Sequence, residues 1–334
     1  TFFLYEAELT LRLRRIRLTE ILESGMLKGV ASTTVKKLLK AGFTTVQAVA
    51  VTPAREIADL AGMGSDTAVK VCRLARMHID PGFVPAIEVL EMRKHMIKCT
   101  TGSEELDRIL GGGIETGAIT ELIGEFGSGK TQICFTLAVT AQQLITEGGF
   151  EGNVCVIDTE GTFMPERIMQ VAEERGLDAT KTLEGILIAR AYNSEHQIIL
   201  INSLPELVEK SGIKLVIMDS MIGHFRGEYI GRGTLAERQQ KLGSCLSKLL
   251  RVAEAFNVSV VLTNQVLSTP DTMYGDPNKP TGGHVMAHAC THRVFLRKGR
   301  KNTRLARVID SPSLPEEKIR FAITAAGVVD SDDD

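Results

Sequence analysis

One segment of the chain has the residue types and the spacing of a phosphate-binding loop. It fits the pattern Gly-x-x-x-x-Gly-Lys-Thr, follows an apolar run over residues 119–123 and precedes a pattern of helical period. Its glycines let backbone N–H groups surround phosphates at the start of a helix. Lys130 would neutralise the β- and γ-phosphates, and the hydroxyl of Thr131 would ligate Mg²⁺. The predicted nucleotide-binding residues here are Gly124, Glu125, Phe126, Gly127, Ser128, Gly129, Lys130, Thr131 and the adjoining Gln132.

Two further apolar runs end in acidic residues. The run that ends at Asp219 would place a carboxylate at the carboxyl edge of a parallel strand, where it can hold the water shell of Mg²⁺. The run over residues 154–157 ends in Asp158 and, two residues later, Glu160. A carboxylate near the γ-phosphate could orient or deprotonate an attacking water. The spacing alone does not decide which of these two acids would do so. A solvated acid at an ordinary strand end is the alternative in each case.

A polar strand end precedes a long loop without periodicity. The apolar run over residues 258–263 ends in Asn264 and Gln265, and an amide at this edge could sense the γ-phosphate. Residues 266–283 then contain three prolines and three glycines, among them Gly282 and Gly283. Loops of this length are usually functional or disordered.

A second glycine-rich loop is predicted over residues 225–233. Its arginines, including Arg226 and Arg232, suit the backbone phosphates of nucleic acid. Solvated surface arginines are the alternative interpretation.

The elements that must position these residues alternate between strand and helix from about residue 100 onward. Short runs rich in Val and Ile separate longer helical patterns, which predicts a mostly parallel sheet covered on both faces. The expected strands are 118–123, 153–158, 186–189, 213–219 and 258–264. The expected helices are 130–147, 165–175, 195–211 and 235–256. Residues 290–325 are expected to add strands that close the sheet.

The preceding residues predict a smaller helical domain. Residues 60–68 fit the apolar-x-Gly-apolar-Gly pattern of a helix-hairpin-helix, in which the amides of the second helix can bind a phosphate. A small helical bundle with glycine turns explains the pattern equally well. The predicted divisions are 1–20 without assignment, 21–79 helix-hairpin-helix domain, 80–99 linker with a helix over 88–98, and 100–334 α/β ATPase core.

Composition limits the classes of protein that the chain can belong to. Of its 334 residues, 43% are hydrophobic and 24% are charged, as in ordinary globular proteins. Six cysteines without a C-x-x-C pair argue against a zinc site or a disulfide framework. No apolar run approaches the roughly 18 residues of a membrane span, and no leader pattern is visible. We therefore expect an intracellular protein without membrane association.

Seven strings together resemble the RecA-like recombinases of archaea and eukaryotes, the RadA family. They are TTGS at 100–103, GGGIET at 111–116, GEFGSGKTQ at 124–132, DTEGTF at 158–163, ARAYN at 189–193, GRGTLAERQQ at 231–240 and TNQV at 263–266. The match runs from about residue 25 to 330. It implies a RecA-like P-loop ATPase that uses ATP and Mg²⁺.

The resemblance also implies a role for individual residues at the nucleotide. Glu160 corresponds to the catalytic carboxylate, Asp219 to the magnesium-side acid and Gln265 to the γ-phosphate sensor. Arg167 matches the arginine that stacks on adenine. The resemblance further implies that a neighbouring subunit contributes His288 near the γ-phosphate and a cap that runs from Asp310 to Pro315.

Further implied roles concern DNA and subunit contacts. Phe83 and Ala86 fit an F-x-x-A tether, which would add an edge strand to the next subunit, where ARAYN places Ala189 and Ala191. Local packing of Phe83 within the linker is the alternative. The first DNA loop would include Arg232 and Arg238, and the second loop would be residues 266–283. The candidate apolar wedges in the second loop are Val266, Leu267, Met273 and Tyr274.

The expected function is therefore a DNA-dependent ATPase that forms helical filaments on single-stranded DNA and exchanges strands with double-stranded DNA in recombinational repair. An accessory paralogue that regulates filaments is the alternative, and a P-loop motor or small-molecule kinase is a more distant one. Mediator proteins could bind the pocket that takes the F-x-x-A motif. The compartment would be the cytoplasm with the nucleoid in an archaeon and the nucleus in a eukaryote.

Overall fold

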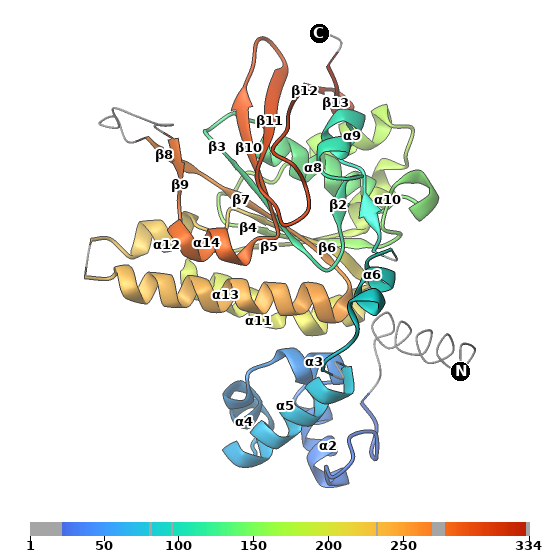
Figure 1. The fold of residues 1–334 in the computed structure, drawn as a ribbon, viewed down its shortest axis with the longest axis vertical. Helices are drawn as coiled ribbons and strands as arrows, with labels where there is room; N and C mark the ends of the chain where they lie inside the picture. The colour runs from blue at the N-terminus through green and yellow to red at the C-terminus, as the bar shows by residue number, and fades with distance from the viewer. Residues whose placement is uncertain (1–21, 80–81, 95, 232, 269–277, 332–334) are drawn as a thin grey trace.

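Figure 1 shows a helical domain below a larger domain built on one twisted sheet. The computed structural model describes residues 22–79, 82–94, 96–231, 233–268 and 278–331. Within these residues, none of the helices has both the length and the apolar character that crossing a membrane requires. Residues 1–20, which the sequence left without assignment, lie outside the described residues.

The described residues of the helical domain form four helices. They are α2 (Ser32–Lys40), α3 (Val46–Val51), α4 (Ala54–Ala61) and α5 (Ser65–Ile79). Helix α4 ends at Gly62, whose φ of 57° is a left-handed conformation that glycine adopts without strain. Helix α5 begins three residues later, an arrangement that both the helix-hairpin-helix and the small-bundle interpretation predict.

The larger domain contains a nine-stranded sheet with the order β13-β12-β11-β10-β3-β7-β6-β4-β5. Its strands are β3 (Ile119–Gly124), β4 (Asn153–Asp158), β5 (Ile186–Arg190), β6 (Ile213–Asp219), β7 (Ser259–Asn264), β10 (His292–Lys298), β11 (Thr303–Asp310), β12 (Lys318–Thr324) and β13 (Gly327–Asp330). Pairing is parallel from β10 through β3 to β5 and antiparallel from β10 to β13. This confirms the predicted mostly parallel sheet with added strands at its end.

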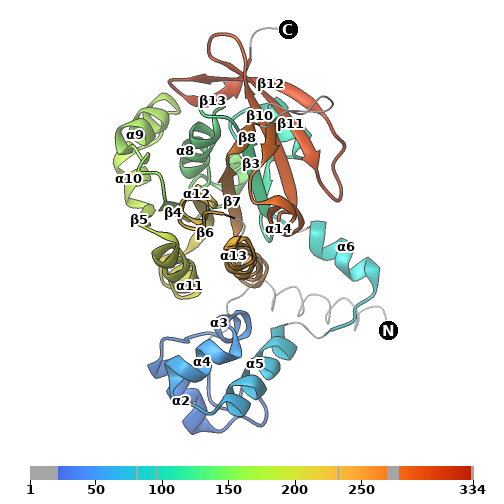
Figure 2. The same cartoon turned by 90° about the vertical axis from the view of Figure 1, so that its left-hand side faces the viewer.

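Helices cover both faces of this sheet, as Figure 2 shows. Alternate residues of the central strands enter two separate cores, one shared with α11, α13 and the helical domain and the other with α8 and α9. The helices are α7 (Glu104–Ile109), α8 (Lys130–Thr140), α9 (Pro165–Glu174), α10 (Ala179–Glu184), α11 (Ser194–Ser211), α12 (Gly223–Glu228), α13 (Leu235–Phe256) and α14 (Gly283–Ala289).

Two predicted helices have different bounds in the structure. The helix expected over 130–147 ends at Thr140, because the chain folds back there and the Phe150 amide donates to the Ala141 carbonyl. A short 3₁₀ helix, Ile145–Glu147, occupies part of the remainder. The linker helix expected over 88–98 is α6 (Ala86–Lys94), and it is followed by β1 (Lys98–Cys99), which pairs with β2 (Ile114–Glu115).

Two predicted loops contain regular structure. The first turns of residues 225–233 belong to α12, because Phe225 is fully buried in the core. The two ends of residues 266–283 pair with each other as β8 (Val266–Ser268) and β9 (Asn278–Pro280). We call this pair of strands the β8–β9 ribbon.

Candidate nucleotide-binding site

The phosphate-binding loop joins β3 to α8, as predicted. Gly129 precedes α8 with a φ of 105°, and no side chain caps the helix. The first amides of a helix have no partner within it, so those of α8 remain available for phosphate oxygens. Gly124 also has to be glycine, since a Cβ there would lie 2.5 Å from both the Leu296 carbonyl oxygen and Ser128 Oγ.

Lys130 lies inside this loop rather than in solvent. Its ammonium donates to the carbonyls of Gly124 at 2.8 Å and Glu125 at 2.9 Å. Burial lowers its pKa, while the nearby carboxylates of Asp219 and Glu160 act in the opposite direction. A partly desolvated ammonium held by two neutral carbonyls is well suited to an anionic ligand.

Asp219 accepts a hydrogen bond from the hydroxyl that is predicted to ligate a metal ion. Thr131 Oγ1 donates to Asp219 Oδ2 at 2.7 Å, and Thr263 donates to the other carboxylate oxygen. Burial raises the pKa of Asp219, and these two hydrogen bonds oppose that shift. A hydroxyl and a carboxylate are the oxygen ligands that Mg²⁺ takes beside nucleotide phosphates. The residues present therefore fit the expected nucleotide and its metal ion.

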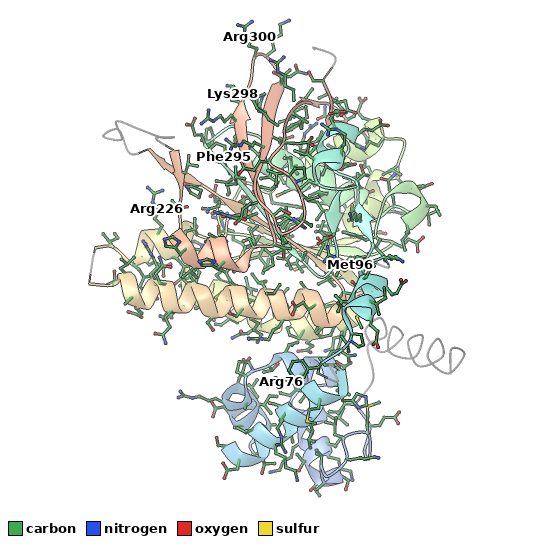
Figure 3. The ribbon with its side chains drawn as sticks, viewed as in Figure 1. Arg76, Met96, Arg226, Phe295, Lys298 and Arg300 are labelled. Carbon is green, nitrogen blue, oxygen red and sulfur yellow. The ribbon has the colours of Figure 1, made fainter. Side chains whose placement is uncertain are left out.

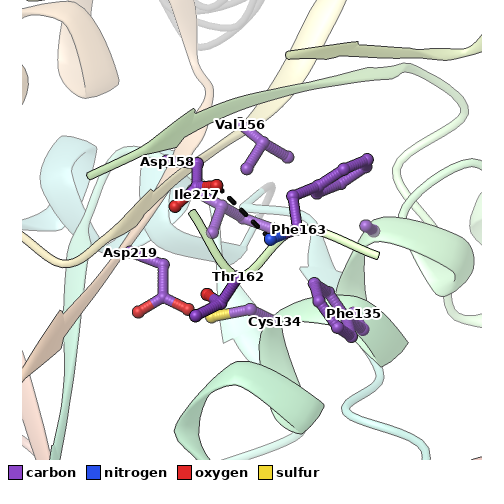
Figure 4. Close-up of a pocket in the computed structure, with 9 residues that line it drawn as sticks. Cys134, Phe135, Val156, Asp158, Thr162, Phe163, Ile217 and Asp219 are labelled. Atoms are coloured by element: carbon purple, nitrogen blue, oxygen red, sulfur yellow. Dashed lines mark hydrogen bonds between the residues drawn. The ribbon is translucent and has the colours of Figure 1, made fainter. Parts of the chain in front are cut away.

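The structure places Asp158 and Glu160, the two acids between which the sequence could not choose, in different surroundings. The carboxylate of Asp158 is buried and accepts from the amides of Glu160 at 2.9 Å and Gly161 at 2.7 Å. Figure 4 shows its further hydrogen bond with the Phe163 amide, beside the small cavity next to Asp219. Arg190 also pairs with Asp158. Asp158 is thus occupied in shaping the turn that carries the next acid.

Glu160 is exposed and faces the other predicted reactive groups. Its Oε1 accepts a hydrogen bond of 2.8 Å from Gln265 Nε2. Both residues line one cavity of about 690 Å³ together with Lys130 and Asp219. This volume lies within the range of roughly 300–1,000 Å³ that small-molecule sites occupy. The predicted catalytic, metal and sensor residues therefore meet in one place.

Another part of the cavity wall is formed by Arg167, Arg304 and Ile323. Arg167 donates to Gln132 Oε1 at 2.9 Å and to the carbonyl of Ala325 at 2.8 Å, and burial lowers its pKa. Arg304 and Ile323 complete this wall, and the sequence did not single them out. Arg304 belongs to the basic run of residues 293–307, but nothing in its spacing distinguished it from its neighbours.

Val266, which the resemblance assigned to the second DNA loop, lines this cavity, whereas several other predicted residues do not. His288 lies on α14, while Asp310 and Pro315 lie at and beyond the end of β11, and all three are exposed. Arg238 is half-buried on α13, and Figure 3 shows Arg226 on the side where the β8–β9 ribbon projects. The predicted contacts of Arg232, Met273 and Tyr274 lie outside the described residues.

The predicted tether and its receiving strand are both open to solvent. Phe83 is fully exposed, and Ala86 begins α6. Strand β5 pairs only with β4, so its outer edge is unpaired among the described residues. Ala189 is half-buried and Ala191 is buried, while Ile188 and Tyr192 beside them are exposed. An exposed apolar residue and an unpaired strand edge have the chemistry of strand addition.

Comparison with known proteins agrees with this arrangement. The family model for Rad51 matches residues 92–331. The chain belongs to the Rad51 family. It is also 45% identical over 313 residues to the DNA repair and recombination protein RadA of Cenarchaeum symbiosum (strain A), a match that covers 92% of this chain and 79% of that protein. The resemblance to RadA-type recombinases and the RecA-like fold of the core are thereby confirmed.

Proposed function

We propose that this Rad51-family chain is a DNA-dependent ATPase and recombinase that assembles on single-stranded DNA and exchanges strands. The observation that carries the proposal is the hydrogen bond between Glu160 and Gln265. It joins the acid of the nucleotide cavity to the residue that directly precedes the β8–β9 ribbon. A change at the γ-phosphate can therefore reach the segment that we propose contacts DNA.

At the nucleotide, each residue has a separate role. Lys130 and the first amides of α8 would bind the phosphates. Thr131 and Asp219 would hold Mg²⁺, which would neutralise phosphate charge. Glu160 orients and deprotonates the attacking water. Gln265 reports on the γ-phosphate, and Arg167 packs against the base.

Assembly would place the nucleotide between subunits. Phe83 and Ala86 of one copy add to the edge of β5 in the next, beside Ala189 and Ala191. His288 and the segment from Asp310 to Pro315 then approach the neighbour's nucleotide. These residues do not line the cavity of their own chain, which supports a role at the nucleotide of a neighbouring copy.

DNA would be held mainly through its phosphates. Arg226, Arg232 and Arg238 supply cations, and residues 266–283 supply apolar side chains between bases. Base pairing, not side-chain contact, provides sequence recognition. Single- and double-stranded DNA are therefore the proposed partners, while mediator proteins would use the site that accepts Phe83.

Electron microscopy of the protein with single-stranded DNA tests this function. Helical filaments with Mg-ATP or a non-hydrolysable analogue, and none without nucleotide, are the expected result. Rings or dispersed particles under every condition would instead favour the accessory paralogue. A strand-exchange assay with homologous and heterologous duplex then separates a recombinase from a filament-forming ATPase.

A further inference from the structure

A buried polar cluster lies between the nucleotide cavity and the base of the β8–β9 ribbon. It comprises Glu121 of β3, Asn264 of β7, Arg293 of β10 and Thr281, which follows β9. None of the four side chains belongs to the cavity lining. Glu121 and Asn264 are completely buried, Thr281 is 4% exposed and Arg293 is 9% exposed. Polar groups buried to this extent are costly unless their hydrogen bonds are made.

Every member of this cluster is held by another. Arg293 Nε donates to Glu121 Oε2 at 2.6 Å, and Asn264 Nδ2 donates to Glu121 Oε1 at 2.6 Å. The carboxylate can only accept, so the amide nitrogen of Asn264 has to face it. The same nitrogen donates to the Thr281 carbonyl at 2.8 Å. Glu121 thereby fixes the orientation of Asn264, and Asn264 fixes the backbone of Thr281.

Thr281 in turn is bound to the backbone of the proposed sensor. Its amide donates to the Gln265 carbonyl at 3.0 Å, and its hydroxyl lies 2.8 Å from the same oxygen. The hydroxyl also contacts Asn264 Oδ1, and its single hydrogen is shared between these two acceptors. Gln265 directly precedes β8 and Thr281 directly follows β9, so this contact joins the two ends of the ribbon at one point.

The cluster also includes a residue of the strand that leads into the phosphate-binding loop. Glu121 lies on β3 three residues before Gly124, where the loop begins. One end of the cluster is thus a rigid central strand of the sheet. The other end is the start of α14, where Gly282 adopts a φ of 89° and Gly283 one of 61°. These two glycines are points at which the chain can change direction without side-chain strain.

We propose that Thr281 is a positioning residue that couples Gln265 to the DNA-contacting ribbon. This inference rests on the proposed function, because it concerns how nucleotide and DNA influence each other. Through its hydroxyl, Thr281 links the end of β9 to the backbone of Gln265, so that a shift of one moves the other. The hydrogen bonds of Asn264, Glu121 and Arg293 hold both segments in a fixed position relative to β3. Loss of the hydroxyl removes a hydrogen bond between buried groups and leaves the bond from the Thr281 amide to the Gln265 carbonyl, so the link between the two ends of the ribbon is weakened.

The test compares Thr281→Val, which removes the hydroxyl at nearly constant volume, with Thr281→Ser, which retains it. The readout is the ratio of the ATPase rate with saturating single-stranded DNA to the rate without DNA. This ratio cancels any loss that both rates share. For Thr281→Val we expect the ratio to fall by about threefold to tenfold, the effect of one buried hydrogen bond. Thr281→Ser should stay close to the wild-type ratio.

Two further measurements distinguish coupling from a structural defect. The salt dependence of DNA binding should be nearly the same for both variants, since Thr281 carries no charge. The melting temperature of Thr281→Val should fall by only a few degrees, the effect of one buried hydrogen bond, so that both variants stay folded in the assay. In a Gln265→Ala background, adding Thr281→Val should change the ratio no further if Thr281 acts through Gln265. An additive effect in that background would overturn the inference.

The same assays distinguish failure of the coupling role of Thr281 from failure of the proposed function. A folded Thr281→Val protein with the wild-type ratio, or with both rates reduced in proportion, would overturn the coupling role and leave the proposed function intact. A wild-type protein that neither binds single-stranded DNA nor is stimulated by it would overturn the proposed function and the inference with it. The two failures are therefore distinguishable in one set of assays.

Discussion

At the scale of single residues, the carboxylates of the site differ in how far they are buried. Asp219 and Asp158 are buried, and each accepts hydrogen bonds from neighbouring groups. Glu160 is exposed to the cavity and has one amide partner. A carboxylate surrounded by donors holds a structure in place, whereas one with free lone pairs can accept a proton.

Lys130→Ala should abolish nucleotide binding, because no other lysine or arginine among the described residues lies inside the phosphate-binding loop. Titration of a fluorescent ATP analogue measures the loss. Lys181→Ala, which removes an exposed lysine on α10, is the matched control. Unchanged ATP affinity in Lys130→Ala would refute the assignment of the loop.

Glu160→Gln should retain ATP binding and lose hydrolysis by roughly 10²–10⁴-fold, the contribution of a positioned general base. Asp158→Asn should instead lower the melting temperature, because the amide cannot accept all the hydrogen bonds that the carboxylate takes. Steady-state phosphate release and thermal denaturation of the two variants give the comparison. If Asp158→Asn lost hydrolysis with an unchanged melting temperature, the roles of the two acids would have to be exchanged.

At the scale of elements, the sequence predicted the strands more accurately than the helix ends. Strands β3 to β7 agree with expectation within one residue at each end, because each contains a short run rich in Val, Ile or Leu. The end of α8 was missed because the chain reverses through hydrogen bonds with Phe150, ten residues beyond the helix end. Helix α12 was missed because its glycines suggested a loop, while burial of Phe225 decided the outcome.

The residues of the candidate site also differ in how far the local sequence predicts them. Residues within the phosphate-binding loop and at strand ends could be predicted, since their spacing fixes their place at one edge of the sheet. Arg304 and Ile323 come from distant antiparallel strands, and only the closing of the sheet brings them to the cavity. The choice between Asp158 and Glu160 depended on hydrogen bonds that no spacing reveals.

Phe83→Glu should give a folded protein that polymerises poorly, because a charge cannot be buried without a partner at the edge of a neighbour's β5. Met77→Glu changes another exposed apolar residue, on α5, and should leave assembly unchanged. Filament length by electron microscopy and light scattering compare the two. Filaments of normal length in Phe83→Glu would return Phe83 to local packing within the linker.

Arg232→Ala and Arg238→Ala should each weaken DNA binding. If each arginine contacts one phosphate, the slope of log affinity against log salt should fall by about one unit per variant. Fluorescence anisotropy with labelled single-stranded DNA over a series of salt concentrations measures it. A variant with an unchanged slope would identify its arginine as solvated surface or internal support.

At the scale of the whole molecule, the helical domain rests on α11 and α13 of the core. Lys248 is buried there and pairs with Glu56 of α4 at 3.3 Å, and Arg251 donates to the Val51 carbonyl at 3.1 Å. Glu209 of α11 accepts from Thr44, and burial raises its pKa to about 7. The contact between the two domains thus includes an acid that is protonated more readily in the folded protein.

The sign of this pKa shift predicts the pH dependence of stability. An unfolded glutamate has a pKa near 4.3, so deprotonation of Glu209 between roughly pH 4.3 and 7 disfavours the folded state. Glu209→Gln keeps the hydrogen bond with Thr44 and cannot ionise. It should therefore raise the melting temperature more at pH 8 than at pH 5. An equal change at both values would show that Glu209 does not titrate at this contact.

The unpaired edge of β5 has a consequence for the direction of any assembly. A contact between Phe83 of one copy and β5 of the next uses two different surfaces, so it repeats head to tail instead of closing as a symmetric pair. One end of such a polymer presents a bare strand, and the other presents a free aromatic side chain. A short peptide with the F-x-x-A pattern would block growth at the first end alone. The two ends of the polymer therefore differ chemically, and a partner protein can bind one end and not the other.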